Sequence, residues 1–278
     1  MTTATHTNIS AAQASRPHRA RLPAYALYQC RDYLMDRGIP TALIGMLFGY
    51  MVGAIMVKEM HQQLDHMSAA AIARRGGLAA ARAGMVADLT RAFLVALLGN
   101  FVFLGALFAM NGIVANDRKQ GYYRFLFAKP VSPERYYAQA FVLHWIGFLV
   151  VTTLLGLLYW SLIGPVLTAP LYAAIGLIYL CYAGIAFALS AAARWDWLSL
   201  VAVTVAANYA WLRFGSTSDT VSPLLYLLPP LHRTSDVYSA VANGAALPWH
   251  LLGWFAAYGV ICFVIGLVVL RYRRLAII

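Results

Sequence analysis

The chain has 278 residues, of which 62% are hydrophobic and only 11% are charged, and its formal net charge is +11. A soluble domain is about half apolar and about a quarter charged, so the composition excludes a soluble fold and predicts an all-α protein that crosses a membrane several times. The positive charge favours an anionic membrane surface over nucleic acid as the electrostatic partner. Three cysteines are too few for a disulfide framework.

The N-terminal region is expected to lie on the cytoplasmic side. Residues 1–21 are polar and lack the apolar core of a signal peptide, so we expect a flexible tail there, followed by a single domain over residues 22–278. Within 22–38, Leu27 and Leu34 share one side at helical spacing, which predicts a helix in the inner membrane interface. An ordinary cytosolic helix is the alternative.

Six apolar segments approach the roughly 20 residues that a spanning helix requires. They are residues 40–57, 92–115, 138–163, 169–193, 197–214 and 249–270. Six spans place both termini on one side, and most of the 21 Lys and Arg residues fall on that side. The positive-inside rule therefore predicts a multi-pass protein of the plasma membrane, here a bacterial inner membrane, with both termini cytoplasmic.

The first span carries glycines at every fourth position, Gly45, Gly49 and Gly53. Small residues at this spacing let two helix backbones approach closely. The pattern predicts a packing face, either between two copies of the chain or within one copy. After this span, residues 58–91 are expected to form an outer loop with two helical, Ala-rich halves that are broken at Gly76–Gly77.

Four polar residues fall inside the other predicted spans, and they are Asn100, Asn111, His144 and Asn208. Polar side chains in lipid face other helices or a cavity, so these residues either hydrogen-bond between helices or line a pathway. Between the last two spans, residues 221–231 are apolar but short and rich in proline. We expect them to lie on or dip into the outer leaflet.

The sequence lacks the common motifs of nucleotide-binding sites and of hydrolase active sites. It contains no G-x-x-x-x-G-K-[ST], H-E-x-x-H or G-x-S-x-G, and none of its ten acidic residues lies in a predicted span. The missing carboxylates count against a secondary transporter driven by protons or sodium. We therefore expect a chain that catalyses no reaction, holds no metal or cofactor, and either serves as a scaffold or is driven by another subunit.

The segment between the second and third spans, residues 116–137, is unusually basic and aromatic. Its residues 118–129 are predicted to form a short amphipathic helix with Tyr122, Phe125 and Leu126 on one face. Such a helix fits a groove on a partner protein or lies on lipid. Pro130 ends it, and Ser132 with Pro133 is predicted to begin the next helix.

This segment, DRKQGYYRFLFAKPVSPERYY, resembles the cytoplasmic loop of type-2 ABC transporter permeases, whose pattern is roughly E-R-E-x-G-T-x-x-x-L-L-x-x-P-[VI]-S. The matching positions are Arg118, Gly121, Phe125, Leu126, Phe127, Pro130, Val131 and Ser132. Lys119 and Tyr122 depart from the family, which frequently has an acidic residue and a threonine there, so the specificity for the partner is open.

The resemblance implies a permease subunit of an ATP-driven exporter. Two permease chains, identical or different, would pair with two ATP-binding subunits that hold ATP and magnesium, and helix 118–129 would be the coupling helix. The residues that the resemblance assigns to coupling are Arg118, Gly121, Tyr122, Arg124, Phe125, Leu126 and Pro130. The alternative is a membrane scaffold or assembly protein that anchors a partner without transport.

Overall fold

The computed structural model describes residues 27, 29–31, 33–94, 99–110, 113–114, 117, 132–192, 197–215 and 225–272. These residues form helices and connections and no strand. The elements are η3 (Leu34–Gly38), α2 (Ile39–Asp65), α3 (Ala69–Arg74), α4 (Leu78–Ala92), α5 (Gly99–Met110), α8 (Pro133–Leu162), α9 (Ala169–Ala192), α10 (Trp197–Phe214), η5 (Leu231–Arg233), α12 (Thr234–Ala242) and α13 (Trp249–Tyr272).

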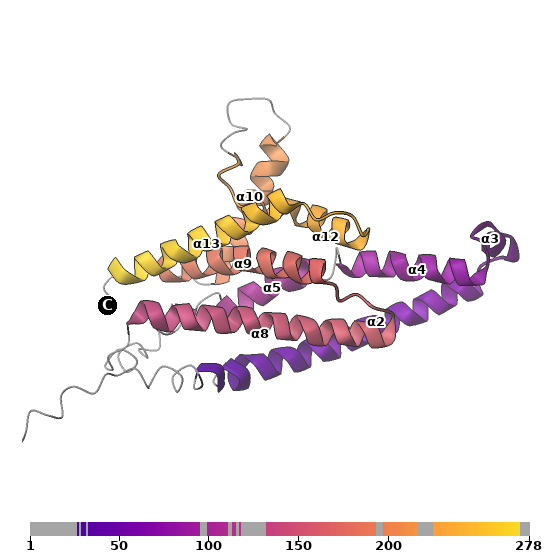
Figure 1. The fold of residues 1–278 in the computed structure, drawn as a ribbon, viewed down its shortest axis with the longest axis horizontal. Coiled ribbons are helices and arrows are strands. Elements are labelled where there is room, and N and C mark those ends of the chain that lie inside the picture. The colour runs from indigo at the N-terminus through magenta and orange to yellow at the C-terminus, as the bar shows by residue number, and fades with distance from the viewer. Residues whose placement is uncertain are drawn as a thin grey trace, which may run out of the picture.

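Four of these helices are long and apolar enough to cross a membrane, namely α2, α8, α9 and α13. They run roughly along one direction, and α2 and α8 begin at the same end of the bundle as α13 ends (Figure 1). The described part of the chain is therefore an all-helical bundle with the helix lengths of a multi-pass membrane protein.

Helix α9 forms the centre of the bundle. The most apolar stretch of 18 residues in α9 is 72% buried, whereas the corresponding stretch of α2 is only 11% buried. It packs along α13 and also contacts α5, α8, α10 and α12. Helix α2 packs mainly on α8 and leaves a broad apolar face exposed, so α9 is the interior helix and α2 a peripheral one.

The second and fifth predicted spans differ from the other four. The predicted span 92–115 is described only in part: α4 ends at Ala92, α5 covers Gly99–Met110, residues 113–114 are helical, and residues 95–98 and 111–112 lie outside the described residues. Helix α10 has the predicted bounds of 197–214 but only 18 residues, among them Asn208 and Arg213, and it runs steeply across the other long helices (Figure 1). Neither is among the helices with the length and apolarity of a membrane span.

The first span extends past its predicted end at residue 57 into the predicted outer segment 58–91. Helix α2 continues through 58–65, because these residues include no glycine or proline to end it. The break at Gly76–Gly77 is confirmed: both glycines have positive φ, 83° and 102°, between α3 and α4. The region is thus a helical hairpin that extends beyond α8 (Figure 1).

The chain passes through residues 38–40 as continuous helix. Gly38 has helical φ and ψ of −65° and −55°, and η3 leads directly into α2. Pro40 lies in the first turn of α2, and the five residues of η3 before it take the wider π-helical form. The described part of the N-terminal helix packs on α8: a Cβ on Gly147 would collide with the Tyr33 ring, and Gln29 donates a hydrogen bond to the Tyr136 carbonyl.

Helix α8 begins as predicted. Ser132 is its N-cap residue, with extended φ and ψ of −73° and 138°, and Pro133 occupies the first turn, although the Ser132 side chain makes no capping hydrogen bond. The apolar segment 221–231 is described from residue 225 on. There Leu225 and Leu231 are buried against the protein, whereas Tyr226 and Leu227 are more than half exposed. Contact of this segment with the outer leaflet stays a prediction.

Candidate functional site

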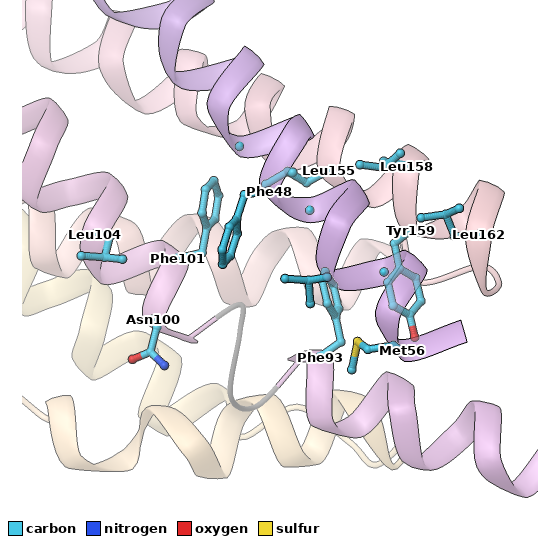
Figure 2. Close-up of a pocket in the computed structure, with 14 residues that line it drawn as sticks. Phe48, Met56, Phe93, Asn100, Phe101, Leu104, Leu155, Leu158, Tyr159 and Leu162 are labelled. Atoms are coloured by element: carbon cyan, nitrogen blue, oxygen red, sulfur yellow. The ribbon is translucent and has the colours of Figure 1, made fainter. Parts of the chain in front are cut away.

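A groove opens between α2, α5 and α8, with a cavity volume of about 390 Å³. Figure 2 shows side chains of the three helices around this space, together with Phe93, which follows α4. The lining residues are Gly45, Phe48, Gly49, Val52, Gly53, Met56, Phe93, Asn100, Phe101, Leu104, Leu155, Leu158, Tyr159 and Leu162. Nearly all of these side chains are apolar.

The glycine stripe of α2 forms one wall of the groove and faces α8. A Cβ added to Gly49 would lie 3.2 Å from a methyl group of Leu155, and one added to Gly53 would lie 2.7 Å from a methyl group of Leu162. Of the two predicted uses of the stripe, packing within the chain is therefore visible in the structure. Packing between two copies stays a prediction.

One end of the groove is closed by a hydrogen-bonded pair of hydroxyl groups. Thr90 of α4 donates to the Val86 carbonyl at 2.8 Å, so it accepts from the Tyr159 hydroxyl at 2.9 Å. The Tyr159 ring stacks on Phe93, with centroids 4.4 Å apart. The hydroxyl groups at this end are thus paired with each other, and apolar ring faces remain to line the groove.

Asn100 is the polar side chain of the predicted set that reaches the groove. It is exposed and lies on α5 at the rim, opposite the α2 wall (Figure 2).

The other predicted pathway residues do not gather at this groove. His144 is buried in α8, where Nδ1 lies 2.6 Å from the Ala140 carbonyl and the ring packs edge-on against Tyr33 at 4.5 Å. It serves helix packing. Asn208 is half-buried on α10 and does not line the groove, and Asn111 lies outside the described residues.

The predicted coupling residues cannot be placed. Arg118, Gly121, Tyr122, Arg124, Phe125, Leu126 and Pro130 all lie outside the described residues. The structure does place the helix that follows them: α8 contacts α2, α5, α9 and α13. Among the described residues, no cluster of His, Cys, Asp and Glu has the arrangement of a metal site.

The sequence patterns identified the α2 wall of the groove and Asn100 on α5 but missed the α8 wall. Leu155, Leu158 and Leu162 of α8 follow helical spacing, but so do many leucines of any spanning helix. Only the crossing of α2 over α8 shows that these three face a groove. Comparison with known proteins adds no relative: no family model, curated protein or solved structure matches the chain.

Proposed function

We propose that this chain is the membrane-spanning permease subunit of an ATP-driven exporter of the ABC-2 type. It would form a path for the transported molecule together with a second permease chain, identical or different. A separate ATP-binding subunit would supply the energy. The proposal is supported by the resemblance of residues 116–137 to the cytoplasmic loop of such permeases, together with the helical bundle that follows.

The place of this segment in the sequence would give it a mechanical role. It leads directly into α8, a 30-residue helix that contacts α2, α5, α9 and α13. A displacement of the residues before Pro133 therefore acts on a helix that touches most of the bundle. This is the arrangement that a switch between two helix packings requires.

The same end of the bundle carries exposed cationic side chains. Arg31 precedes η3, Arg135 lies in the first turn of α8, and Arg271 lies in the last turn of α13. Cations at this end would be attracted to anionic lipid headgroups of the inner leaflet. Exposed cations also lie at the opposite end, on the hairpin of α2, α3 and α4. The cytoplasmic position of the segment and of both termini therefore rests on the charge count of the whole sequence.

The test is co-expression of the chain with a candidate ATP-binding subunit, followed by purification into lipid nanodiscs. The variant Phe125→Ala/Leu126→Ala removes the apolar face of the proposed coupling helix. The matched control Phe108→Ala/Leu157→Ala removes the same two residue types from exposed positions on α5 and α8. We expect the first variant to lose assembly or ATPase stimulation and the control to keep both.

Failure of the two proteins to co-purify would contradict the permease proposal. Co-purification with identical ATPase rates in wild type and in the Phe125→Ala/Leu126→Ala variant would contradict the role of the segment. It would favour the alternative, a membrane scaffold that anchors a partner without transport.

A further inference from the structure

Asp117 and Tyr137 flank residues 118–131 in the sequence and are joined by a hydrogen bond. The Tyr137 hydroxyl donates to Oδ2 of Asp117 at 3.1 Å. Tyr137, the fifth residue of α8, is fully buried, whereas Asp117 is half-buried. The bond therefore holds the chain before residues 118–131 and the chain after them together, at the point where α8 enters the bundle.

The chain before Asp117 is also fixed to the central helix. The backbone N–H of Val114 donates a hydrogen bond to Oγ of Ser190 on α9 at 3.1 Å, and both residues are fully buried. Asp117 follows Val114 by three residues. The carboxyl group that Tyr137 contacts is thus carried by a stretch of chain that is anchored on α9.

The start of α8 makes a further contact, with the N-terminal helix. Nε2 of Gln29 donates a hydrogen bond to the carbonyl oxygen of Tyr136 at 3.3 Å. The first turns of α8 are therefore linked to two other parts of the chain. The backbone of Tyr136 joins them to the N-terminal helix, and the side chain of Tyr137 joins them to Asp117.

Burial by itself does not explain the bond between Tyr137 and Asp117. Tyr179 and Tyr238 are buried to the same degree, and their hydroxyl groups find no hydrogen-bond partner in the described part of the chain. A tyrosine of this protein can therefore fill the core without such a bond. A hydrogen bond to a charged group is roughly twice as strong as one between neutral groups, so the Asp117 carboxylate is suited to holding two parts of the chain together.

We propose that Asp117 and Tyr137 are positioning residues that make the two ends of the coupling segment, residues 118–131, move as one. This inference rests on the proposed exporter function. With the bond in place, a displacement of the coupling segment acts on α8 through Tyr137 and on α9 through Val114 and Ser190. Without the bond, either end can shift alone, and less of the displacement reaches these two helices, which contact most of the bundle.

The test measures ATP hydrolysis by the full chain assembled with the candidate ATP-binding subunit in lipid nanodiscs. Tyr137→Phe removes the hydroxyl group and keeps the ring that fills the core. We expect the two proteins to co-purify and the KM for ATP to stay unchanged, because ATP is held by the other subunit. The stimulated kcat should fall roughly fivefold or more, which is the lower end of typical coupling between sites.

Three further variants separate positioning from a general loss of stability. Tyr172→Phe removes a hydroxyl group that donates to Thr153 of α8 at 3.0 Å, at the opposite end of α9 from Ser190, and it should keep the wild-type kcat. Asp117→Asn retains a side-chain oxygen that accepts from Tyr137, so it should keep most of the stimulation. Asp117→Ala should lose the stimulation to the same extent as Tyr137→Phe.

The double variant Asp117→Ala/Tyr137→Phe should lose no more than either single variant, because both changes remove the same bond. Equal kcat in wild type and in Tyr137→Phe overturns this proposal alone and leaves the exporter proposal standing. Loss of co-purification in Tyr137→Phe, or an equal loss of kcat in Tyr172→Phe, also overturns it, because the bond would then serve only the stability of the fold. If the wild-type chain neither binds nor stimulates the ATP-binding subunit, the exporter proposal fails and this one fails with it.

Discussion

Gly184 of α9 and Gly259 of α13 face each other with no side chain between them. A Cβ on Gly184 would collide with the Gly259 carbonyl group, and a Cβ on Gly259 would lie 2.6 Å from the Leu180 carbonyl oxygen. Small residues at such a crossing let helix backbones approach closely and gain van der Waals contacts. This contact holds α13 against the central helix.

Substitution of either glycine by alanine should destabilise the protein strongly. The new methyl group meets backbone atoms, which cannot move aside as a side chain can, and overpacking of this kind costs about 1–3 kcal/mol. The free energy of unfolding in detergent, followed by circular dichroism, measures the loss. The matched control is Gly253→Ala on the same helix, where a Cβ would meet nothing within 4 Å. The control should be neutral or stabilise by up to about 1 kcal/mol.

Gly53→Ala in α2 should cost less than Gly259→Ala. The Cβ at Gly53 would lie 2.7 Å from a terminal methyl group of Leu162, and a side chain can turn away at a cost of about 0.5–1.5 kcal/mol. Parallel unfolding measurements on the two variants test this order. Equal destabilisation would mean that α2 is held on α8 as rigidly as α13 is held on α9.

Removal of the Tyr159 hydroxyl should loosen α4 from α8. Tyr159→Phe breaks the 2.9 Å hydrogen bond to Thr90, which is expected to contribute about 0.5–1.5 kcal/mol. A double-mutant cycle with Thr90→Val isolates the contribution of the pair. Full additivity of the two single changes would show that the hydrogen bond contributes nothing to stability.

The stability of the protein should depend on the protonation of His232 in η5. Burial lowers the pKa of His232, and the Arg233 cation lowers it further, while Asp236 opposes the shift. The ring also stacks on Trp211, with centroids 4.1 Å apart. Below its ordinary pKa of about 6.5, the unfolded chain therefore binds a proton that the folded protein resists.

The resulting stability is fully present above about pH 6.5 and decreases as the pH falls from that value toward the lowered pKa of the folded protein. Unfolding free energies measured from pH 7.5 to 5 should show this decrease, and His232→Gln should reduce its slope. His250→Gln, at an exposed position in α13, is the control and should keep the slope. The same slope in wild type and in His232→Gln would show that His232 does not cause this pH dependence of stability.

Local sequence features correctly predicted several element boundaries. Pro133 with Ser132 before it marks the start of α8, and Gly76–Gly77 marks the break between α3 and α4. Each of these signals acts through the backbone of the residue itself, by fixed φ or by tolerance of positive φ. Gly38 carried no such requirement, and the chain passes through it as helix.

Of the groove, the sequence identified the glycine wall on α2 and Asn100 on α5 but not the α8 wall. Gly45, Gly49 and Gly53 repeat every four residues and so share a face wherever α2 packs. The opposite wall at Leu155 and the backbone contact at Gly184 carry no such pattern. These contacts depend on which helices cross and on the residues at which each pair of helices crosses.

The sequence by itself determined that this protein is helical and rich in segments with the length and apolarity of membrane spans, because hydrophobic composition and segment length are properties of the chain alone. Only the tertiary structure decided that α9 is the buried centre, that α10 runs across the bundle, and that α2 leaves a groove beside α8. These features arise from contacts between residues far apart in the chain, and the four long apolar helices are too uniformly apolar for their sequences to specify which neighbour each one meets.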